Sequence, residues 1–149
     1  METPAPRLPL TIIVIEDNPV DVYLIRWVLH AHELSHELHV IDNGDRAMDY
    51  VNQLAREERR SPTIMLLDLN LPQRDGREIL PRVKAIPHGS DIRVVVVTSS
   101  TNLTDRRETL VMGADAYFEK PNHLNEFMQL GDLIKHLAFG NPPPSIQNN

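Results

Sequence analysis

Five short apolar runs alternate along the chain with stretches of helical periodicity, and this alternation restricts the fold more than any other feature. The runs occupy residues 10–15, 37–41, 63–67, 92–97 and 115–118. Runs of this length, rich in β-branched and aromatic residues, are typical of strands. Strands that alternate with helices predict a parallel sheet, because each helix returns the chain to the edge where the next strand begins.

The stretches between and after the runs carry signals for five helices. The first follows Asn18, a helix-capping residue type, and Pro19, which suits the first helical position. Its expected core-facing stripe comprises Val20, Leu24, Trp27, Val28 and Ala31. The start signals of the later helices are Asn43-Gly44-Asp45, Asp75-Gly76, Thr101 or Asn102, and Asn122 or Asn125. These helices are expected to end near residues 57, 85, 113 and 139, with Pro81 straining the third.

The complete pattern predicts one α/β domain with a doubly wound five-stranded parallel sheet and helices on both faces. The expected strand order is the flavodoxin-like order 2-1-3-4-5. A chain of 149 residues has the length of one domain. Residues 10–139 are expected to form that domain, with a flexible arm at 1–9 and a proline-rich tail at 140–149.

Composition excludes several classes of function. The chain has no cysteine, which excludes thiol chemistry and favours a cytoplasmic location. A formal net charge of -6 at pH 7 repels polyphosphate, so no nucleic-acid partner is expected. No apolar run reaches the length of a bilayer span, so no membrane partner is expected. His30, His32, His36 and His39 fall on a helix end, a turn and a strand, and are interpreted as solvated rather than as a zinc site.

Residues whose side chains can bind a metal or take part in catalysis follow four of the predicted strands. Glu16-Asp17 follows the first strand, Asp68 the third, Thr98 the fourth and Lys120 the fifth. The carboxyl ends of parallel strands share one edge, and ligands of doubly wound sheets bind there. Three carboxylates that meet at this edge repel one another unless a cation neutralises them, and all-oxygen ligands suit Mg²⁺.

Asp68 follows the third strand, at the point where the strand order reverses, and is the expected nucleophile towards phosphorus. Glu16 and Asp17 are then expected to hold the metal. The Lys120 ammonium and the Thr98 hydroxyl are expected to stabilise the negative charge of the transferred phosphoryl group.

Together these residues resemble the response regulator receiver domains of two-component signalling, over roughly residues 10–138. The likeness rests on Glu16-Asp17, Gly76, Thr98, Lys120-Pro121 and the phosphoacceptor segment Leu66-Leu67-Asp68-Leu69-Asn70-Leu71-Pro72. It implies that a sensor histidine kinase phosphorylates Asp68 in the presence of Mg²⁺, for which Mn²⁺ substitutes, and that phosphorylation alters the interaction surface.

The resemblance also implies finer details of the site. The backbone carbonyl of Asn70 would be a further metal ligand, and the Lys120–Pro121 bond would be cis. Tyr117 would be the aromatic residue that changes rotamer together with Thr98. The segments Leu69-Asn70-Leu71-Pro72 and Asp75-Gly76-Arg77-Glu78 look most like single-domain regulators that partner phytochrome-type sensor kinases.

Two other functions use the same residues. An aspartate-nucleophile phosphohydrolase also needs Mg²⁺, a strand-end aspartate, a threonine and a lysine. Such enzymes carry a second carboxylate two residues after the nucleophile, where this chain has Asn70, and no segment remains for a cap over the substrate. A receiver that acts as a scaffold without phosphorylation is disfavoured by the intact residue set.

The predicted fifth helix suggests self-association. Its expected core-facing residues are Leu124, Phe127, Met128, Ile134 and Ala138. Leu130, Leu133 and Leu137 lie outside that face, so the apolar surface spans roughly 220° of the helix, more than one core contact needs. Either the tail or a second copy covers the remainder, and a homodimer through this face is the preferred interpretation.

Overall fold

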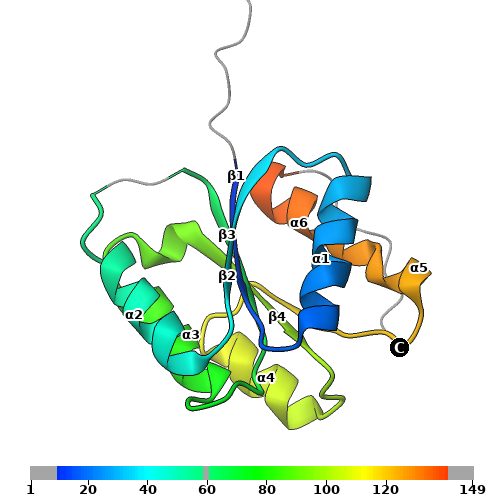
Figure 1. Cartoon of the computed structure of the whole chain (residues 1–149). Coiled ribbons are helices and arrows are strands. Elements are labelled where there is room, and N and C mark those ends of the chain that lie inside the picture. The colour runs from blue at the N-terminus through cyan, green and yellow to red at the C-terminus, as the bar shows by residue number, and fades with distance from the viewer. Residues whose placement is uncertain (1–9, 59–60, 141–149) are drawn as a thin grey trace, which may run out of the picture.

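The computed structural model describes residues 10–58 and 61–140, which form a five-stranded, all-parallel sheet (Figure 1). The strands are β1 (Leu10–Ile15), β2 (His36–Ile41), β3 (Thr63–Leu67), β4 (Ile92–Thr98) and β5 (Ala116–Glu119). Their order is β2-β1-β3-β4-β5, which confirms the predicted topology. The predicted arm at 1–9 and residues 141–149 of the predicted tail lie outside the described residues.

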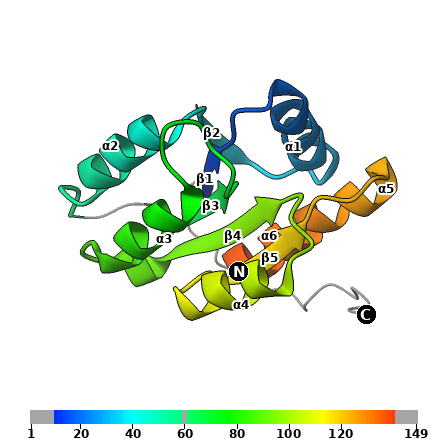
Figure 2. The ribbon, with the colours of Figure 1, turned by 90° about the horizontal axis from the view of Figure 1, so that it is seen from below.

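Helices cover both faces of this sheet (Figures 1 and 2). They are α1 (Pro19–Ala31), α2 (Gly44–Leu54), α3 (Gly76–Ala85), α4 (Leu103–Val111), α5 (Leu124–Phe127) and α6 (Gln129–Phe139), with a short 3₁₀ turn, η1 (Gly89–Asp91). Four helices begin at a side-chain cap, in which the oxygen of the cap residue accepts a backbone N–H. These caps are Asn18, Asn43, Asp75 and Asn102, so the first three predicted starts are confirmed and Asn102 is the correct alternative for the fourth.

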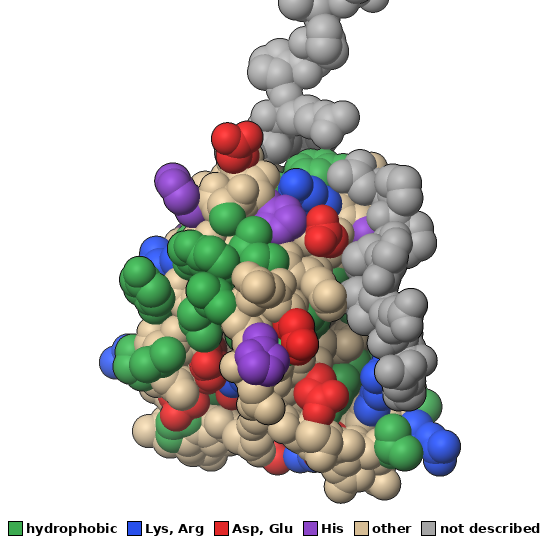
Figure 3. Space-filling view, turned by 90° about the vertical axis from the view of Figure 1, so that its right-hand side faces the viewer, with side chains coloured by type: hydrophobic (Ala, Val, Ile, Leu, Met, Phe, Trp, Pro, Cys, Tyr) green, Lys and Arg blue, Asp and Glu red, His purple; other side chains and the backbone are tan. Residues whose placement is uncertain are grey.

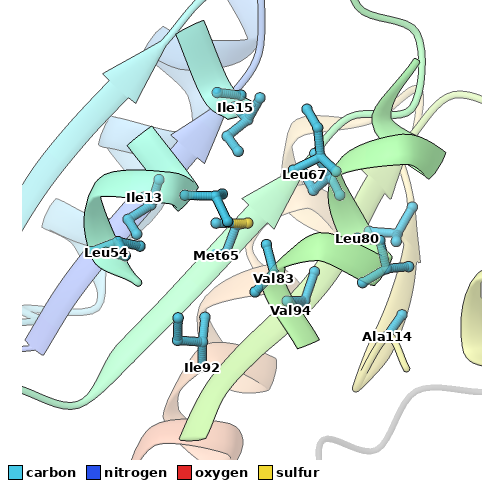
Figure 4. Packing of buried hydrophobic residues seen from close by; sticks show 14 of the residues in the cluster. Ile13, Ile15, Leu54, Met65, Leu67, Leu80, Val83, Ile92, Val94 and Ala114 are labelled. Atoms are coloured by element: carbon cyan, nitrogen blue, oxygen red, sulfur yellow. The ribbon is translucent and has the colours of Figure 1, made fainter. Parts of the chain in front are cut away.

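Two hydrophobic clusters bury the two faces of the sheet. Figure 4 shows the cluster between the sheet and α2 and α3, where Met65 and Leu67 of β3 pack against Leu80 and Val83 of α3. The other cluster joins the opposite face to α1, α5 and α6. Because the central strands are buried on both faces, nearly all their residues are apolar until the strand ends, where polar residues begin.

The face that α1 presents to the sheet differs from the predicted stripe. Ile25, Val28 and Leu29 are buried, whereas Val20 is 63% exposed and Ala31 is also exposed. Apolar residues surround much of this helix, so a helical period fits more than one stripe. The contact with the sheet, which periodicity alone does not specify, selects the face.

The predicted fifth helix is two helices, α5 and α6, which meet at Met128. The N-cap of α5 is His123 rather than Asn122 or Asn125. The Met128 carbonyl accepts hydrogen bonds from the Gly131 N–H at 3.0 Å and from His32 Nε2 at 2.9 Å. His32 therefore packs at the junction instead of being solvated, and a side chain at Gly131 would collide with its ring.

This break changes which residues of the segment face the core. Leu130 is fully buried beside Phe127 and Ile134, contrary to the prediction, and Leu124 is 48% exposed. Leu133 and Leu137 are partly buried and pack against the same cluster. The predicted uncovered surface is therefore smaller than the sequence indicated.

Pro81 does not interrupt α3, which is continuous from Gly76 to Ala85. Among the described residues, no helix is both long enough and apolar enough to span a bilayer.

Candidate functional site

Asp68 lies directly after β3, in the middle of the sheet. Its backbone N–H donates to the carbonyl of Ile15 at 3.0 Å, which fixes the ends of β3 and β1 side by side. The residue is only 6% exposed. Gly76 of α3 approaches it so closely that a Cβ there would lie 2.3 Å from the Asp68 carbonyl oxygen. The glycine thus allows α3 to begin directly over the strand end.

Three carboxylates gather at this point, as the sequence predicts. Glu16, Asp17 and Asp68 each offer an oxygen within 4.8 Å of the others. Glu16 and Asp68 are buried, whereas Asp17 is exposed and lines a groove of about 630 Å³ together with Asn70 and Glu78. Carboxylate oxygens without nitrogen or sulfur ligands suit a hard divalent cation. The donor set therefore fits Mg²⁺ or Mn²⁺.

Asn70 lies at the entrance to the cluster. Its backbone N–H donates to Asp68 Oδ1 at 3.2 Å, so the loop after β3 folds back over the carboxylate. The predicted role of the Asn70 carbonyl as a metal ligand stays a prediction.

Lys120 joins the cluster from the end of β5. Its Nζ donates to Glu16 Oε1 at 2.5 Å, to Asp21 Oδ2 at 2.7 Å and to Asp68 Oδ2 at 3.1 Å. Sequence reasoning placed Lys120 beside Glu16 and Asp68 but missed Asp21. Asp21 is the third residue of α1, and no sequence pattern indicates its contact with Lys120.

Burial and mutual repulsion shift the ionisation of these groups. Burial raises the pKa of Glu16 to about 8, and the charge of Asp68 acts in the same direction, while the hydrogen bond from Lys120 acts against both. For Lys120, burial lowers the pKa, but the hydrogen bonds to Asp21 and Glu16 outweigh burial and hold the pKa above its usual range. The ammonium is therefore charged at neutral pH, and a bound cation would favour ionised Glu16.

Thr98 and Tyr117 lie on the neighbouring strands β4 and β5. Thr98 is fully buried, and its hydroxyl oxygen accepts the backbone N–H of Ser100 at 3.3 Å. The Tyr117 hydroxyl donates to the Ser100 carbonyl at 3.0 Å. Both predicted switch residues thus contact the loop between β4 and α4, and their coupled rotamer change stays a prediction.

The predicted cis bond between Lys120 and Pro121 is wrong, because the described residues contain no cis peptide bond. The trans form is the more stable isomer of most peptide bonds before proline. With this bond trans, the Lys120 N–H still reaches the Thr98 carbonyl at 2.8 Å and its ammonium still reaches the carboxylates.

A second polar network, absent from the sequence-based prediction, connects the β4–α4 loop to α3. The Ser100 hydroxyl donates to Asp105 of α4 at 2.6 Å, and Arg77 of α3 forms an ion pair with the same carboxylate. Arg77 also bonds Asp75 at 3.0 Å. The Arg77–Asp105 contact, which joins the two helices, spans 28 residues of sequence, so no local pattern indicates it.

Comparison with known proteins identifies the family. The family profile described as the response regulator receiver domain matches residues 12–131. The chain belongs to the response regulator receiver domain family. Domains of this family are in general phosphoacceptors rather than enzymes, and they interact with sensor histidine kinases.

Among the receiver relatives, response regulator Rcp1 of Synechocystis sp. PCC 6803 is 34% identical over 123 residues, covering 82% of this chain and 84% of Rcp1. The crystal structure of the phosphorylated cyanobacterial phytochrome response regulator RcpA superposes with a TM-score of 0.77 at 32% identity, covering 93% of this chain and all of RcpA. The crystal structure of the Mn²⁺-bound form of Rcp1 superposes with a TM-score of 0.75 at 32% identity, covering 92% of this chain and all of the Rcp1 chain. The comparisons support a receiver of the phytochrome response regulator type.

Proposed function

We propose that this receiver is a stand-alone response regulator in which Asp68 accepts a phosphoryl group from a sensor histidine kinase. The observation that carries the proposal is the convergence of Glu16, Asp17 and Lys120 on the Asp68 carboxylate. The phosphorylated state of the relative RcpA supports the same chemistry. An altered interaction surface then passes the signal on in a phosphorelay.

In the transfer step, an oxygen of Asp68 attacks the phosphorus of a phosphohistidine. A P–O bond forms while the P–N bond breaks, and the leaving imidazole takes a proton from solvent. The Lys120 ammonium stabilises negative charge on the phosphoryl oxygens, and the Thr98 hydroxyl donates to one of them. Both groups are placed by strand ends, since Thr98 is the last residue of β4 and Lys120 follows β5 directly.

The metal proposed for this site is Mg²⁺, with Mn²⁺ as a substitute. Glu16, Asp17, Asp68 and the Asn70 carbonyl would hold it, and Mn²⁺ is bound in the relative Rcp1. When bound, the ion neutralises the repelling carboxylates and withdraws charge from the phosphoryl oxygens.

The proposed receiver also takes phosphate from small donors such as acetyl phosphate and loses it slowly to water. The phosphohydrolase alternative is not favoured. Asn70 stands two residues after Asp68, where that class has its general acid, and the family is one of phosphoacceptors.

The proposed kinase is of the phytochrome type and acts in the cytoplasm. Hydrophobic side chains gather over α1, on the left of Figure 3. The exposed apolar side chains of α1 include Tyr23, which is 68% exposed, and Val20, near the start of the helix. Because α1 begins just after the acidic pair and exposes apolar side chains, we assign the kinase contact to it.

The proposed homodimer occupies a different face. The sequence-based interpretation placed the homodimer on the face of the fifth helix. Because Leu130 of that face is buried, we now assign the dimer contact to exposed apolar side chains of α4 and the end of α6, namely Leu103, Leu110, Val111 and Phe139. A second copy would cover the same patch on both subunits, as two-fold symmetry requires.

Intact-mass spectrometry tests the proposed function with two phosphodonors, acetyl phosphate and a phosphorylated phytochrome-type histidine kinase, each with Mg²⁺. Wild type is expected to gain one phosphate from both, and Asp68→Asn to gain none. Tyr23→Ala is expected to react normally with acetyl phosphate and more slowly with the kinase.

The matched control is Val111→Ala, which removes an apolar side chain that is more exposed than Tyr23 but lies on α4, and it should leave both reactions unchanged. Phosphate on Asp68→Asn would contradict the assignment of the phosphoacceptor. Sustained release of phosphate from many donor molecules would favour the phosphohydrolase.

A further inference from the structure

Lys120 is held by a carboxylate that does not belong to the acidic cluster. An ammonium has three N–H donors. Glu16, Asp21 and Asp68 occupy all three, and only Asp21 is absent from the group whose oxygens could share a cation. Asp21 is therefore the acceptor of Lys120 that lies outside the candidate cation site.

Asp21 presents its carboxylate from a rigid element. It is the third residue of α1, whose start is fixed by Pro19 and by the Asn18 side chain, which accepts the Val20 N–H at 2.9 Å. A negative charge in the first turn of a helix is favourable. The Asp21 side chain is 17% exposed, so solvent only partly competes for Lys120. Of the residues that bond Lys120, Asp21 alone comes from a helix.

The other two acceptors of Lys120 change their partners when the site is used. A cation held by Glu16 and Asp68 competes with the ammonium for their oxygens and repels it through like charge. A phosphoryl group on Asp68 needs the same ammonium for its own oxygens. Without a third acceptor, a long lysine side chain would gain rotamer freedom and leave the crevice.

We propose that Asp21 is a positioning residue for phosphorylation, which keeps the Lys120 ammonium in the crevice while Lys120 exchanges Asp68 for a phosphoryl oxygen. Asp21 acts through Lys120 and does not touch phosphorus. The inference rests on the proposed function, in which Asp68 is the phosphoacceptor.

The first test is independent of phosphorylation. In metal-free protein, the ¹⁵N-detected ammonium signal of Lys120 is expected to be resolved, because three bound donors exchange slowly with water. Asp21→Ala should broaden that signal, whereas Asp49→Ala, which removes an exposed carboxylate from α2, should leave it intact. An unchanged signal in Asp21→Ala would overturn the proposal, whatever the outcome for Asp68.

The second test measures the rate of phosphorylation by acetyl phosphate at saturating Mg²⁺ and saturating donor. Asp21→Ala is expected to lower this rate about tenfold, since a misplaced catalytic group costs at least that much. Asp21→Asn keeps an acceptor oxygen and should be intermediate. Thermal unfolding of each variant checks that the fold is retained. If Asp21→Ala is unstable, the rate of the near-isosteric Asp21→Asn provides the test instead.

Two results would overturn the assignment. One is a wild-type rate in Asp21→Ala. The other is an equal loss of rate in Asp21→Asn and Asp49→Asn, which would show that the rate depends on the net charge of the protein and not on the position of Asp21. Failure of the wild type itself to react would instead contradict the proposed function, and the ammonium signal would still report on Asp21.

Discussion

At the scale of single residues, Glu16 is the group whose ionisation depends most on the fold. Its carboxylate is 3% exposed and faces both Asp68 and Lys120. Burial raises its pKa to about 8 from an ordinary value of 4.5. Between these two pH values the folded protein holds a proton on Glu16 that the unfolded chain releases.

This difference predicts a pH dependence of stability. A raised carboxyl pKa contributes stability that is complete below about pH 4.5 and is lost as the pH rises to about 8. We expect the free energy of unfolding of metal-free protein to fall by roughly one to a few kcal/mol across this window because of Glu16. Urea unfolding at pH 5 and pH 8, followed by Trp27 fluorescence, measures the change.

Glu16→Gln should lose most of this pH dependence and be more stable than wild type at pH 8 without metal. Addition of Mg²⁺ should stabilise wild type at pH 8 much more than Glu16→Gln. Glu58→Gln, an exposed position after α2 that does not line the groove beside Asp17, is the control. Identical pH profiles for wild type and Glu16→Gln would contradict the assignment.

Sequence reasoning found the site residues that follow strands, and it missed those whose role depends on packing between helices. Glu16, Asp68 and Lys120 could be predicted because parallel topology brings strand ends together. Asp21 could not, because its contact with Lys120 depends on how α1 lies on the sheet, and neither capping nor periodicity specifies that orientation.

At the scale of secondary-structure elements, the wrong predictions are again those that depend on how the elements pack against one another. Strand and helix starts follow local chemistry, so the cap at Asn18 and the bounds of β3 were predictable. The division between α5 and α6 was not, since it coincides with a hydrogen bond from His32, almost a hundred residues away. Leu130 entered the core for the same reason.

The polar network between α3 and α4 leads to a prediction about mobility. Asp105 accepts from Ser100 and pairs with Arg77, and these contacts hold its pKa below the usual range. We expect Asp105→Asn to speed amide hydrogen exchange across α4, because the charge-assisted bonds that hold the helix are weakened. Hydrogen exchange followed by mass spectrometry measures this effect.

Asp49→Asn on α2 is the matched control and should leave exchange in α4 unchanged. The effect should be local, with exchange in β1 and β3 as slow as in wild type. Exchange in α4 that is insensitive to Asp105→Asn would show that apolar packing alone holds this helix.

At the scale of the whole molecule, the exposed apolar side chains of α4 and α6 predict a homodimer. Val111 is 88% exposed and Phe139 is 41% exposed. We expect light scattering at tens of micromolar to give the mass of two chains for wild type and of one chain for Val111→Glu, because a charge in an apolar interface is costly. Val20→Glu on α1 should remain dimeric.

A monomeric wild type, with and without phosphate, would exclude this dimer. Dimers of Val111→Glu and Phe139→Glu would place the interface on another face.

The long reach of the crevice contacts has a consequence for the order of folding. β1 pairs with β3 through Thr11 and Thr63, and the Lys120–Glu16 bond joins residues 104 positions apart. Contacts at such separations form slowly, because large loops must close first. A nascent or partly folded chain cannot bring Lys120 to Asp68 before its last strand has docked. If Asp68 is the phosphoacceptor, as proposed, the chain gains its reactivity towards a phosphodonor only after the last strand has docked.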